Sequence, residues 1–437
     1  MANKFVEELR WRGMVHDIMP GTEEQLDKEM TTAYIGFDPT SDSLHIGSLV
    51  PIILLVHLEK AGHKPIALVG GATGMIGDPS GKSDERNLLD EDTLAHNVAG
   101  IKNVLSRFLD FNSKEKNAPV LVNNYDWMKD FTFIDFARDV GKRITVNYMM
   151  AKDSVKKRFS GEEGSVGMSF TEFTYQLIQG YDFYHLHKEM DCKLQMGGSD
   201  QWGNITTGTE LVRRMNVGGD TVAKAFAMTC PLITKADGSK FGKSEGGNVW
   251  LDADKTSVYK FYQFWLNTTD EDAEKYIKIF TFLDKETIEN LITEHNENPG
   301  ARLLQKRLSE EVTTFVHSKE ALDEAIETSQ VLFSRNFKED IKKINSTTLD
   351  DLFSDIKTAE IKRSQIESGL DIIAALSAET NFLSSNGEAR RSLKANAVSV
   401  NKEKVDENYI IQTSDLIADK YIVLNSGKKN TYIIKVV

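Results

Sequence analysis

Two short polar stretches contain the residue types that phosphate chemistry uses. In DPTSDSLHIGSL, residues 38–49, His45 stands just before the apolar run LVPIILLVHL. The Asp, Pro and Ser residues there suit a turn and a helix cap, which accounts for the turn but not for the histidine. In TKADGSKFGKSEG, residues 234–246, Lys240 and Lys243 stand three apart on a glycine-containing loop, where two cations can clamp a polyphosphate. Taken alone, a solvated basic turn is the simpler explanation of this second stretch.

A third loop, VGGATGMIGDPSGKS at residues 69–83, is rich in glycine but lacks two common nucleotide-binding motifs. Gly77 gives the pattern G-x-x-x-G-K-S, which is one residue short of a phosphate-binding P-loop, and the other glycines do not form G-x-G-x-x-G. The glycines can serve tight turns alone, but a turn does not also require Asp78, Lys82 and Arg86. These charged groups indicate a polar ligand.

The segments around these loops alternate between strand-like and helix-like patterns, which predicts parallel βαβ units in an α/β domain. We expect strands in TAYIGF (32–37), KPIALVGG (64–71) and APVLVNN (118–124), and helices in LVPIILLVHLEKAG (49–62) and EDTLAHNVAGIKNVLSRFLDF (91–111). Ligands of such sheets bind at the carboxyl ends of the strands. Those ends carry YIGFDPT, the glycine-rich loop and NNYDW, so we expect the binding site there.

Composition excludes several function classes. The 437 residues suggest roughly three domains, and 40% hydrophobic residues can fill their cores. A net charge of −13 argues against nonspecific coating of nucleic acid but permits a local basic patch that binds RNA phosphates. Cys192 and Cys230 form neither a disulfide framework nor a zinc site, and MANKFVEELRWRGM lacks the apolar core of a signal peptide. We expect a cytoplasmic protein with no membrane role.

Taken together, HIGS at residues 45–48 and KFGKS at residues 240–244 resemble the HIGH and KMSKS signatures of class I aminoacyl-tRNA synthetases. Longer segments are similar to the bacterial tyrosyl-tRNA synthetases across nearly the whole first 330 residues: YIGFDPTSDSLHIGS, ALVGGATGMIGDPSGKSDER, NYMMAKDSV, SFTEFTYQLIQGYDF and LQMGGSDQWGNI. The resemblance implies an α/β fold, with a Rossmann-like parallel-sheet catalytic domain, then an α-helical domain and a small α+β RNA-binding domain. It also implies ATP-dependent activation of L-tyrosine and transfer of the tyrosyl group to the 3′ end of tRNA(Tyr).

The resemblance assigns the activation step to residues that surround ATP. Attack of a carboxylate on the α-phosphorus needs positioning and electrostatic stabilisation and no protein nucleophile. His45 would act at a helix N-terminus, where backbone N–H groups and the helix dipole already favour phosphate. The implied catalytic residues are Thr40, His45, Ser48, Lys82, Arg86, Lys240 and Lys243, and the implied ATP-binding residues are Asp38, His45, Gly47, Asp200, Gln201 and Lys243. Ser48 replaces the family's second histidine, and it either donates to the nucleotide or only begins a helix turn.

We expect no metal held by the protein itself. Mg²⁺ would bind the pyrophosphate oxygens, and no carboxylate cluster indicates a dedicated site. HLH at residues 185–187 has no third ligand at a suitable spacing, so a pair on a helix surface is the expected structure. Apart from ATP as a substrate, no tightly bound cofactor is expected.

Recognition of L-tyrosine is implied for a different set, which contains Tyr34, Asp78, Tyr175, Gln179, Asp182 and Gln195, with Gln201 beside them. Tyr175, Gln179 and Asp182 stand at i, i+4 and i+7, so one helical face can present all three, although YQLIQGYDF also fits an amphipathic core helix. By resemblance, Tyr34 and Asp182 bond the phenol, while Asp78, Tyr175 and Gln179 hold the ammonium group. Phenylalanine would leave both phenol partners unpaired.

Contacts with tRNA and with a second subunit are also implied. FIDFARDVGKRITVNYMMA, residues 133–151, resembles the family's dimer interface and predicts a homodimer. The cations implied near the acceptor arm are Arg213 and Arg214, together with Lys152, Lys156, Lys157 and Arg158, although a solvated helix face is an equally good explanation.

The chain after residue 370 is similar to an RNA-binding module first known in a small-subunit ribosomal protein. In NGEARRSLKANA, Asn386 is the expected helix cap, and Arg390, Arg391 and Lys394 follow on about one helix turn, where they would bind tRNA. YIVLNSGKKNTYIIKVV predicts a hairpin with two lysines, Lys428 and Lys429, in its turn. A small helix-hairpin cap with ordinary surface lysines is the alternative.

We expect a catalytic domain with the dimer interface at residues 1–250, a helical anticodon-side domain at 251–340, a linker at 341–370 and the RNA-binding domain at 371–437. A nucleotidyltransferase that acts without RNA is the alternative function, but it has no need of the long C-terminal part. A non-catalytic RNA-binding relative is disfavoured because His45, Lys240 and Lys243 are retained. Tryptophanyl-tRNA synthetases are the nearest neighbours in the class, and the pair of Tyr34 and Asp182 argues against an indole.

Overall fold

The computed structural model describes residues 4–78, 89–159, 167–216, 224–239, 241–244, 247–331, 334, 337–341, 344, 346–354, 356–427 and 430–437. The chain forms two compact units. The first contains residues 1–255 and 267–308, and the second contains residues 256–266 and 309–437. The helical part after residue 250 is therefore divided between the units, whereas the sequence predicted one helical domain there.

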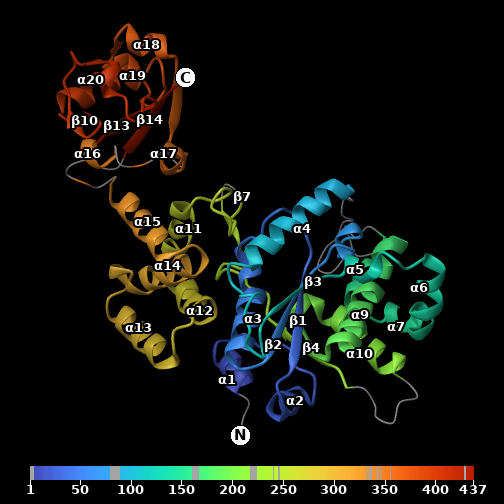
Figure 1. Cartoon of the computed structure of the whole chain (residues 1–437). Coiled ribbons are helices and arrows are strands. Elements are labelled where there is room, and N and C mark those ends of the chain that lie inside the picture. The colour runs from blue at the N-terminus through green and yellow to red at the C-terminus, as the bar shows by residue number, and fades with distance from the viewer. Residues whose placement is uncertain are drawn as a thin grey trace. The chain divides into compact units, whose positions relative to one another are not determined.

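The first unit is built on a five-stranded sheet in the order β3-β2-β1-β4-β5, and every neighbouring pair is parallel (Figure 1). Its strands are Thr32–Phe37 (β1), Lys64–Val69 (β2), Val120–Asn123 (β3), Cys192–Gly198 (β4) and Phe226–Cys230 (β5). Most residues of β1, β2, β4 and β5 are buried, as expected for strands that are covered on both faces. The predicted α/β class and the three strands expected from the sequence are confirmed.

Long helices connect and cover these strands. They are Leu49–Lys60 (α3), Glu91–Leu105 (α4), Phe170–Met190 (α9) and Trp202–Met215 (α10). In Figure 1, α3 lies on one side of the sheet, and α9 and α10 lie on the other. Side chains fix the starts of two of them: Asp90 accepts from the Thr93 N–H before α4, and Ser169 forms a capping box with Glu172 before α9. The helix expected at 91–111 is correct in position but ends at Leu105.

The strand order reverses next to β1. The chain moves outward from β1 through β2 to β3 and then returns to place β4 on the other side of β1. In open parallel sheets, the crevice at such a reversal, outside the carboxyl ends of the strands, is where ligands bind. The carboxyl ends of β1 and β4 lead into residues 38–45 and 198–201, so the two loops meet at this crevice.

Further elements complete the first unit. Before β1 lie Lys4–Trp11 (α1) and Thr22–Lys28 (α2). Between β1 and α10 lie Ile46–Ser48 (η1), Thr73–Met75 (η2), Tyr125–Met128 (α5), Phe133–Asp139 (α6), Gly141–Arg143 (η3), Val146–Met150 (α7), Asp153–Phe159 (α8) and Ser199–Gln201 (η4). After β5 come Lys243–Ser244 (β6), Gly247–Asn248 (β7), Asp270–Phe280 (α12), Lys285–Glu297 (α13) and Pro299–Ala301 (η5), and Leu303–Val316 (α14) spans the boundary between the units.

The second unit contains another five-stranded sheet, in the order β11-β10-β13-β14-β8. Its strands are Thr358–Ile361 (β8), Val398–Val400 (β10), Glu403–Lys404 (β11), Tyr421–Ser426 (β13) and Asn430–Val436 (β14), with a separate pair, Leu370–Asp371 (β9) and Ile410–Ile411 (β12). Its helices are Val258–Leu266 (α11), Lys319–Val331 (α15), Phe337–Asp340 (α16), Ser346–Ser354 (α17), Arg363–Glu367 (α18), Ile372–Leu376 (α19), Asn386–Lys394 (α20) and Thr413–Asp415 (η7). The predicted terminal hairpin is formed by β13 and β14, and the turn residues Lys428 and Lys429 lie outside the described residues.

Two expectations for this unit need correction. Residues 341–370 were expected to be a linker, but they include α17, β8 and α18, and β8 pairs in parallel with β14 at the edge of the sheet. The helix cap is Ser385, whose side chain accepts from the Glu388 N–H, and Asn386 is the first residue of α20. The Asn386 side chain instead accepts a hydrogen bond from Ser377 Oγ at 2.5 Å, so it connects α20 to the end of α19.

No helix among the described residues is long and apolar enough to cross a membrane.

Candidate active site

A cavity of about 240 Å³ lies at the crevice between β1 and β4. The six residues predicted to recognise L-tyrosine all line it, and they come from β1, the loop after β2, α9 and β4: Tyr34, Asp78, Tyr175, Gln179, Asp182 and Gln195. Asp38, Asp200 and Gln201 from the predicted ATP-binding set line it as well. The fold therefore brings together side chains that the sequence places far apart.

One end of the cavity contains the buried hydroxyl of Tyr34 and the buried carboxyl group of Asp182. Tyr34 is 1% exposed, and its phenol oxygen has no hydrogen-bond partner among the described residues. Asp182, also 1% exposed, accepts from Asn124 Nδ2 at 3.0 Å and from Trp127 Nε1 at 2.8 Å. Burial raises the pKa of Asp182 to about 7, because a low-polarity surrounding disfavours the ionised form. This end can bind a hydroxyl group that both donates and accepts.

Asn124 and Trp127 were not assigned a role from the sequence. Asn124 is completely buried, and besides Asp182 it bonds Thr73 Oγ1 at 3.2 Å and the Ala72 N–H at 2.7 Å. Together with Trp127, it fixes both oxygens of Asp182. The stretch NNYDW at the end of β3 was the available signal, since it follows the carboxyl end of a strand, but nothing in the sequence indicates which side chain these residues contact.

The other end of the cavity is acidic. Asp38 accepts from Tyr175 Oη at 2.8 Å and from Thr73 Oγ1 at 2.7 Å, and Asp78 accepts from Gln201 Nε2 at 2.5 Å. With Asp182 and Asp200, four carboxyl groups line the cavity, and its described lining contains no Lys or Arg. Burial and the nearby charge of Asp78 raise the pKa of Asp200. The cavity therefore favours a cationic group such as an ammonium.

His45 is the N-cap of the short η1 helix, in the connection between β1 and α3. Its Nδ1 accepts a hydrogen bond from the Gly47 N–H at 3.0 Å. The ring lies so close that a Cβ on Gly47 would be 2.6 Å from His45 Cε1, so a larger residue would push the imidazole out of this position. Burial lowers the pKa of His45, which keeps the imidazole neutral near pH 7. Because Nδ1 accepts, the ring hydrogen is on Nε2, which can donate to an anionic oxygen.

The HIGS stretch pairs with the chain that follows the KFGKS stretch. His45 forms an antiparallel bridge with Trp250, the Ile46 N–H donates to the Val249 carbonyl at 2.9 Å, and the Leu251 N–H donates to the Leu44 carbonyl at 2.8 Å. A Cβ on Gly242 would lie 3.8 Å from His45 Nδ1, so the second stretch reaches the histidine itself. The two signatures thus form one surface.

Of the remaining predicted catalytic residues, Thr40 and Ser48 have described side chains. Thr40 is exposed in the turn after β1, and its N–H donates to the Asp38 carbonyl at 2.9 Å. Ser48 precedes α3, and its side chain makes no capping hydrogen bond, so the helix start does not use its hydroxyl. Lys82, Arg86 and Lys240 lie outside the described residues, and Lys243 is described only through its backbone in β6.

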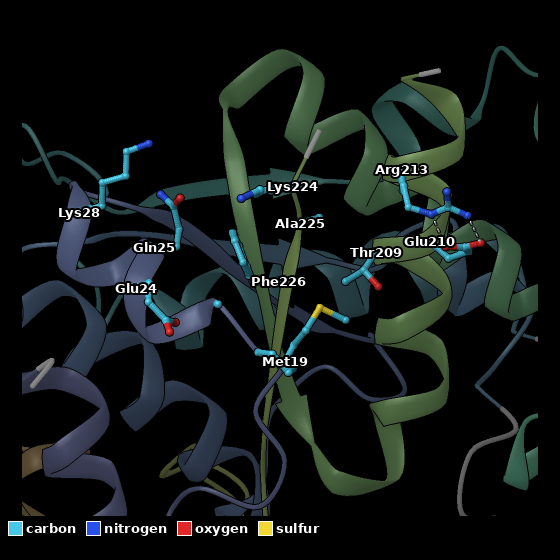
Figure 2. A pocket seen from close by; sticks show the side chains of 12 residues that line it. Met19, Glu24, Gln25, Lys28, Thr209, Glu210, Arg213, Lys224, Ala225 and Phe226 are labelled. Carbon is cyan, nitrogen blue, oxygen red and sulfur yellow. Dashed lines mark hydrogen bonds and ion pairs between the residues drawn. The ribbon is translucent and has the colours of Figure 1, made fainter. Parts of the chain in front are cut away.

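A larger cavity, about 640 Å³, lies between α2, α10 and the start of β5. Figure 2 shows Arg213 on its wall, held by Glu210, with Lys28 and Lys224 across from it. The two Arg213–Glu210 hydrogen bonds are 2.7 and 2.8 Å long. This cavity is at the amino end of β5, away from the carboxyl-end crevice, so it is not the candidate active site.

Two of the cations expected near the tRNA acceptor arm are not free surface groups. Arg158 is buried and forms an ion pair with the equally buried Glu172 at 3.0 Å, so it stabilises the start of α9. Lys152 donates to Tyr148 Oη and Thr206 Oγ1, and burial lowers its pKa to about 8. The expectation that Arg158 faces tRNA is therefore wrong. In the second unit, Arg390, Arg391 and Lys394 of α20 are all exposed, as a phosphate-binding surface requires.

Comparisons with known proteins agree with this geometry. A family model described as "tRNA synthetases class I (W and Y)" matches residues 26–334. The chain belongs to this family of class I tRNA synthetases. A second model, described as the tyrosine–tRNA ligase SYY-like C-terminal domain, matches residues 348–434. That match includes most of α17 and all of β8, in agreement with the sheet of the second unit. Membership in the class I synthetases makes ATP a substrate.

Individual relatives cover nearly the whole chain. The tyrosine–tRNA ligase of Flavobacterium johnsoniae is 71% identical over 433 residues, with 99% of each chain covered. The tyrosine–tRNA ligase of Porphyromonas gingivalis is 59% identical over 431 residues, which cover 98% of this chain and 99% of the relative.

Solved structures of this synthetase family have the same catalytic fold. A C-terminally truncated mitochondrial tyrosyl-tRNA synthetase from Aspergillus nidulans is 31% identical, with a TM-score of 0.66 over 75% of this chain and 94% of that chain. The tryptophanyl-tRNA synthetase of Plasmodium falciparum, 12% identical over 73% of this chain and 84% of that chain with a TM-score of 0.51, shares the fold alone. The predicted Rossmann-like class I catalytic domain is confirmed.

Proposed function

We propose that this chain is a tyrosine–tRNA ligase. It activates L-tyrosine with ATP to tyrosyl-adenylate and pyrophosphate, and it then transfers the tyrosyl group to the 3′ end of tRNA(Tyr), releasing AMP. A relative of that name matches 99% of the chain at 71% identity. The observation that carries the choice of amino acid is the buried phenol oxygen of Tyr34, which has no hydrogen-bond partner among the described residues and lies in the same cavity as Asp182.

The cavity accounts for recognition of both ends of tyrosine. A substrate phenol can donate to the Asp182 carboxylate and form a hydrogen bond with Tyr34 Oη, which finds no partner in the part of the chain that the structure describes. The substrate ammonium group would lie at the acidic end, near Asp78, Tyr175 and Gln179. Gln179 and Gln195 each have a buried side-chain oxygen without a partner among the described residues, and these oxygens can accept from the ammonium and from ordered water.

Activation requires no protein nucleophile. A carboxylate oxygen of tyrosine attacks the α-phosphorus of ATP, a mixed anhydride forms, and the bond to the β,γ-pyrophosphate breaks. Negative charge then grows on the departing pyrophosphate. His45 Nε2 would donate to these oxygens, with Thr40 beside it, and stabilise the transition state through a fixed, neutral donor. Lys82, Arg86, Lys240 and Lys243 are proposed to supply the positive charge that the described lining of the cavity lacks.

The nucleotide would lie between the two signatures. Gly47 permits close approach beside the imidazole, and Asp200 and Gln201 follow the carboxyl end of β4, where Asp200 can accept from ribose hydroxyls. The described residues contain no group of three or more His, Cys, Asp or Glu side chains that could hold a metal ion. Mg²⁺ would therefore be held mainly by ATP and water, and its charge would neutralise the phosphates.

A homodimer is part of the proposal. Phe133, Ile134, Val146 and Phe170 are between 62% and 73% exposed, and all except Phe170 belong to the segment predicted as the dimer interface. Such an exposed apolar group needs a covering partner. Transfer RNA would bind Arg213 and Arg214 in the first unit and Arg390, Arg391 and Lys394 in the second. Because protein synthesis consumes the product, we propose a cytoplasmic location.

Exchange of labelled pyrophosphate into ATP tests the proposal directly. The purified chain should catalyse exchange with L-tyrosine and should require Mg²⁺, and it should charge tRNA(Tyr) but not tRNA for tryptophan. Exchange that is supported by tryptophan or by another amino acid better than by tyrosine would contradict the assignment. Exchange with tyrosine but no charging of any tRNA would instead favour an adenylating enzyme that does not act on RNA.

A further inference from the structure

The turn that carries Thr40 and leads to His45 is seated on helix α4, which supplies none of the predicted site residues. Asn97 in this helix is 6% exposed, and its Nδ2 donates to the Pro39 carbonyl at 3.0 Å. This bond holds the turn immediately before Thr40. The donor comes from a helix separated from the turn by all of α3 and β2, so neither the motif nor its spacing indicates it.

Gly100, almost one helix turn further along α4, allows the turn to approach the helix backbone. A Cβ at this position would lie 1.9 Å from the Asp42 carbonyl oxygen and 2.7 Å from its carbon. Real Cβ contacts are essentially never shorter than 3.0 Å, so alanine would force a separation of at least 1.1 Å (3.0 − 1.9) between two backbones. Glycine is a poor helix former, and its place in the middle of a helix indicates a packing requirement.

Contacts with residues 250–255 also hold the turn and the residues that follow it. Lys255 Nζ forms an ion pair with Asp42 Oδ1 at 2.7 Å. The Leu251 N–H holds the Leu44 carbonyl at 2.8 Å, and Trp250 bridges His45. Displacement of residues 39–42 by α4 would therefore be passed along the chain to the imidazole and to the strand that follows the KFGKS stretch.

We propose that Asn97 and Gly100 are positioning residues for ATP: by seating the turn at residues 39–42 on α4, they set where Thr40 and His45 meet the phosphates. The inference rests on the proposed function, because it concerns the nucleotide half of that site. The phenol end of the tyrosine site is held by Asn124 and Trp127 on Asp182, whereas Asp38, next to the turn, accepts from Tyr175, so α4 should affect the use of ATP more strongly than the binding of tyrosine.

Steady-state pyrophosphate exchange with full-length Asn97→Ala and Gly100→Ala tests this split. We expect kcat/KM for ATP to fall roughly 10- to 100-fold in each, since an ångström-scale misplacement of reacting groups has effects of this size. The dissociation constant for L-tyrosine, measured by equilibrium dialysis without ATP, should change less, by about twofold or less, because the hydrogen bonds of Asn124 and Trp127 to Asp182 do not involve α4. Asn103→Ala, an exposed asparagine in the same helix, is the matched control and should resemble wild type in both measurements.

The outcomes separate this inference from the proposed function. A wild-type chain without tyrosine-dependent exchange would overturn the proposed function. An active wild type whose Asn97→Ala variant keeps its kcat/KM for ATP would overturn the inference, as would a variant that loses tyrosine binding to the same extent as ATP use. Thermal unfolding of each variant identifies loss of fold. If Gly100→Ala does not fold, Asn97→Ala compared with Asn103→Ala decides the question.

Discussion

The Gly47 N–H donates to Nδ1 of His45 at 3.0 Å, and this single bond determines how the histidine can act. It places the ring hydrogen on Nε2 and leaves the imidazole as a neutral donor whose orientation does not depend on substrate. Burial lowers its pKa, so the neutral form is present throughout the physiological range. A fixed donor needs no reorganisation as charge develops on the phosphates, which is the condition for efficient stabilisation of a transition state.

His45→Ala should lower kcat for ATP–pyrophosphate exchange roughly 10²- to 10³-fold, the usual effect of removing one preorganised donor. Ser48→His should retain exchange within about tenfold, because the Ser48 side chain takes no part in the helix cap and the substitution restores a residue of the same donor type as the family motif. Exchange kinetics at saturating tyrosine measure both. Equal losses in the two variants would contradict the roles assigned here.

Tyr34→Phe should reduce discrimination against phenylalanine. The substitution removes a buried hydroxyl that has no partner in the described structure, so it costs a hydrogen bond to the substrate phenol and leaves the binding of phenylalanine almost unaffected. A bond of this kind contributes about 0.5–1.5 kcal/mol, so the ratio of kcat/KM for tyrosine to that for phenylalanine should fall roughly two- to tenfold. Tyr184→Phe, which is on α9 but not in the cavity lining, is the control. An unchanged ratio in Tyr34→Phe would exclude the phenol contact.

Tyrosine use should depend on pH through Asp182. Burial raises the pKa of Asp182 to about 7, so the carboxyl group gains a proton as the pH falls below that value. The protonated oxygen can no longer accept a hydrogen bond from the substrate phenol. We expect kcat/KM for tyrosine to be constant above about pH 8 and to fall toward a tenfold loss per pH unit below about pH 6. A profile that is flat across this window would show that ionised Asp182 is not required.

Arg213→Glu should weaken the use of tRNA and leave pyrophosphate exchange unchanged. The Arg213 side chain is 54% exposed and, among the described residues, donates hydrogen bonds to Glu210 alone. Arg214 also donates to the Arg143 carbonyl at 2.8 Å and helps to hold the fold. For this reason the single substitution is a cleaner test than reversal of both. KM for tRNA should rise about three- to tenfold. Lys114→Glu, an exposed lysine of the same unit, should have no effect, and impaired exchange in Arg213→Glu would argue against a role in tRNA binding.

Simultaneous reversal of Arg390, Arg391 and Lys394 to glutamate should separate charging from activation. All three side chains are exposed on α20, so the substitutions should leave the fold intact. Log affinity for tRNA falls linearly with log salt, and loss of three phosphate contacts would make this slope shallower by about two. Pyrophosphate exchange should stay at the wild-type rate. Filter binding at several salt concentrations measures the slope. A wild-type slope would show that α20 does not contact tRNA phosphates.

Local pattern was sufficient for much of the fold. The alternation of apolar runs with amphipathic segments located β1, β2, β3, α3 and α4, because strand and helix periodicity are properties of neighbouring residues. The i, i+4 and i+7 spacing placed Tyr175, Gln179 and Asp182 on one face of α9, and the structure has all three in the cavity lining. The short strand β8 was missed, since its identity depends on pairing with β14 near the end of the chain.

The sequence by itself determined which residue types are available for tyrosine and ATP, and the order of the elements that carry them. Only the tertiary structure decided which of their polar groups are already satisfied. Asn124 and Trp127 donate hydrogen bonds to Asp182, and Arg158 forms an ion pair with Glu172. Helix α4 supports the turn before His45. These contacts join segments far apart in the chain, and their energetic effect comes from burial, which makes an unpaired polar group costly and a paired one specific. A local sequence pattern does not indicate which partner such a polar side chain has or how deeply it is buried.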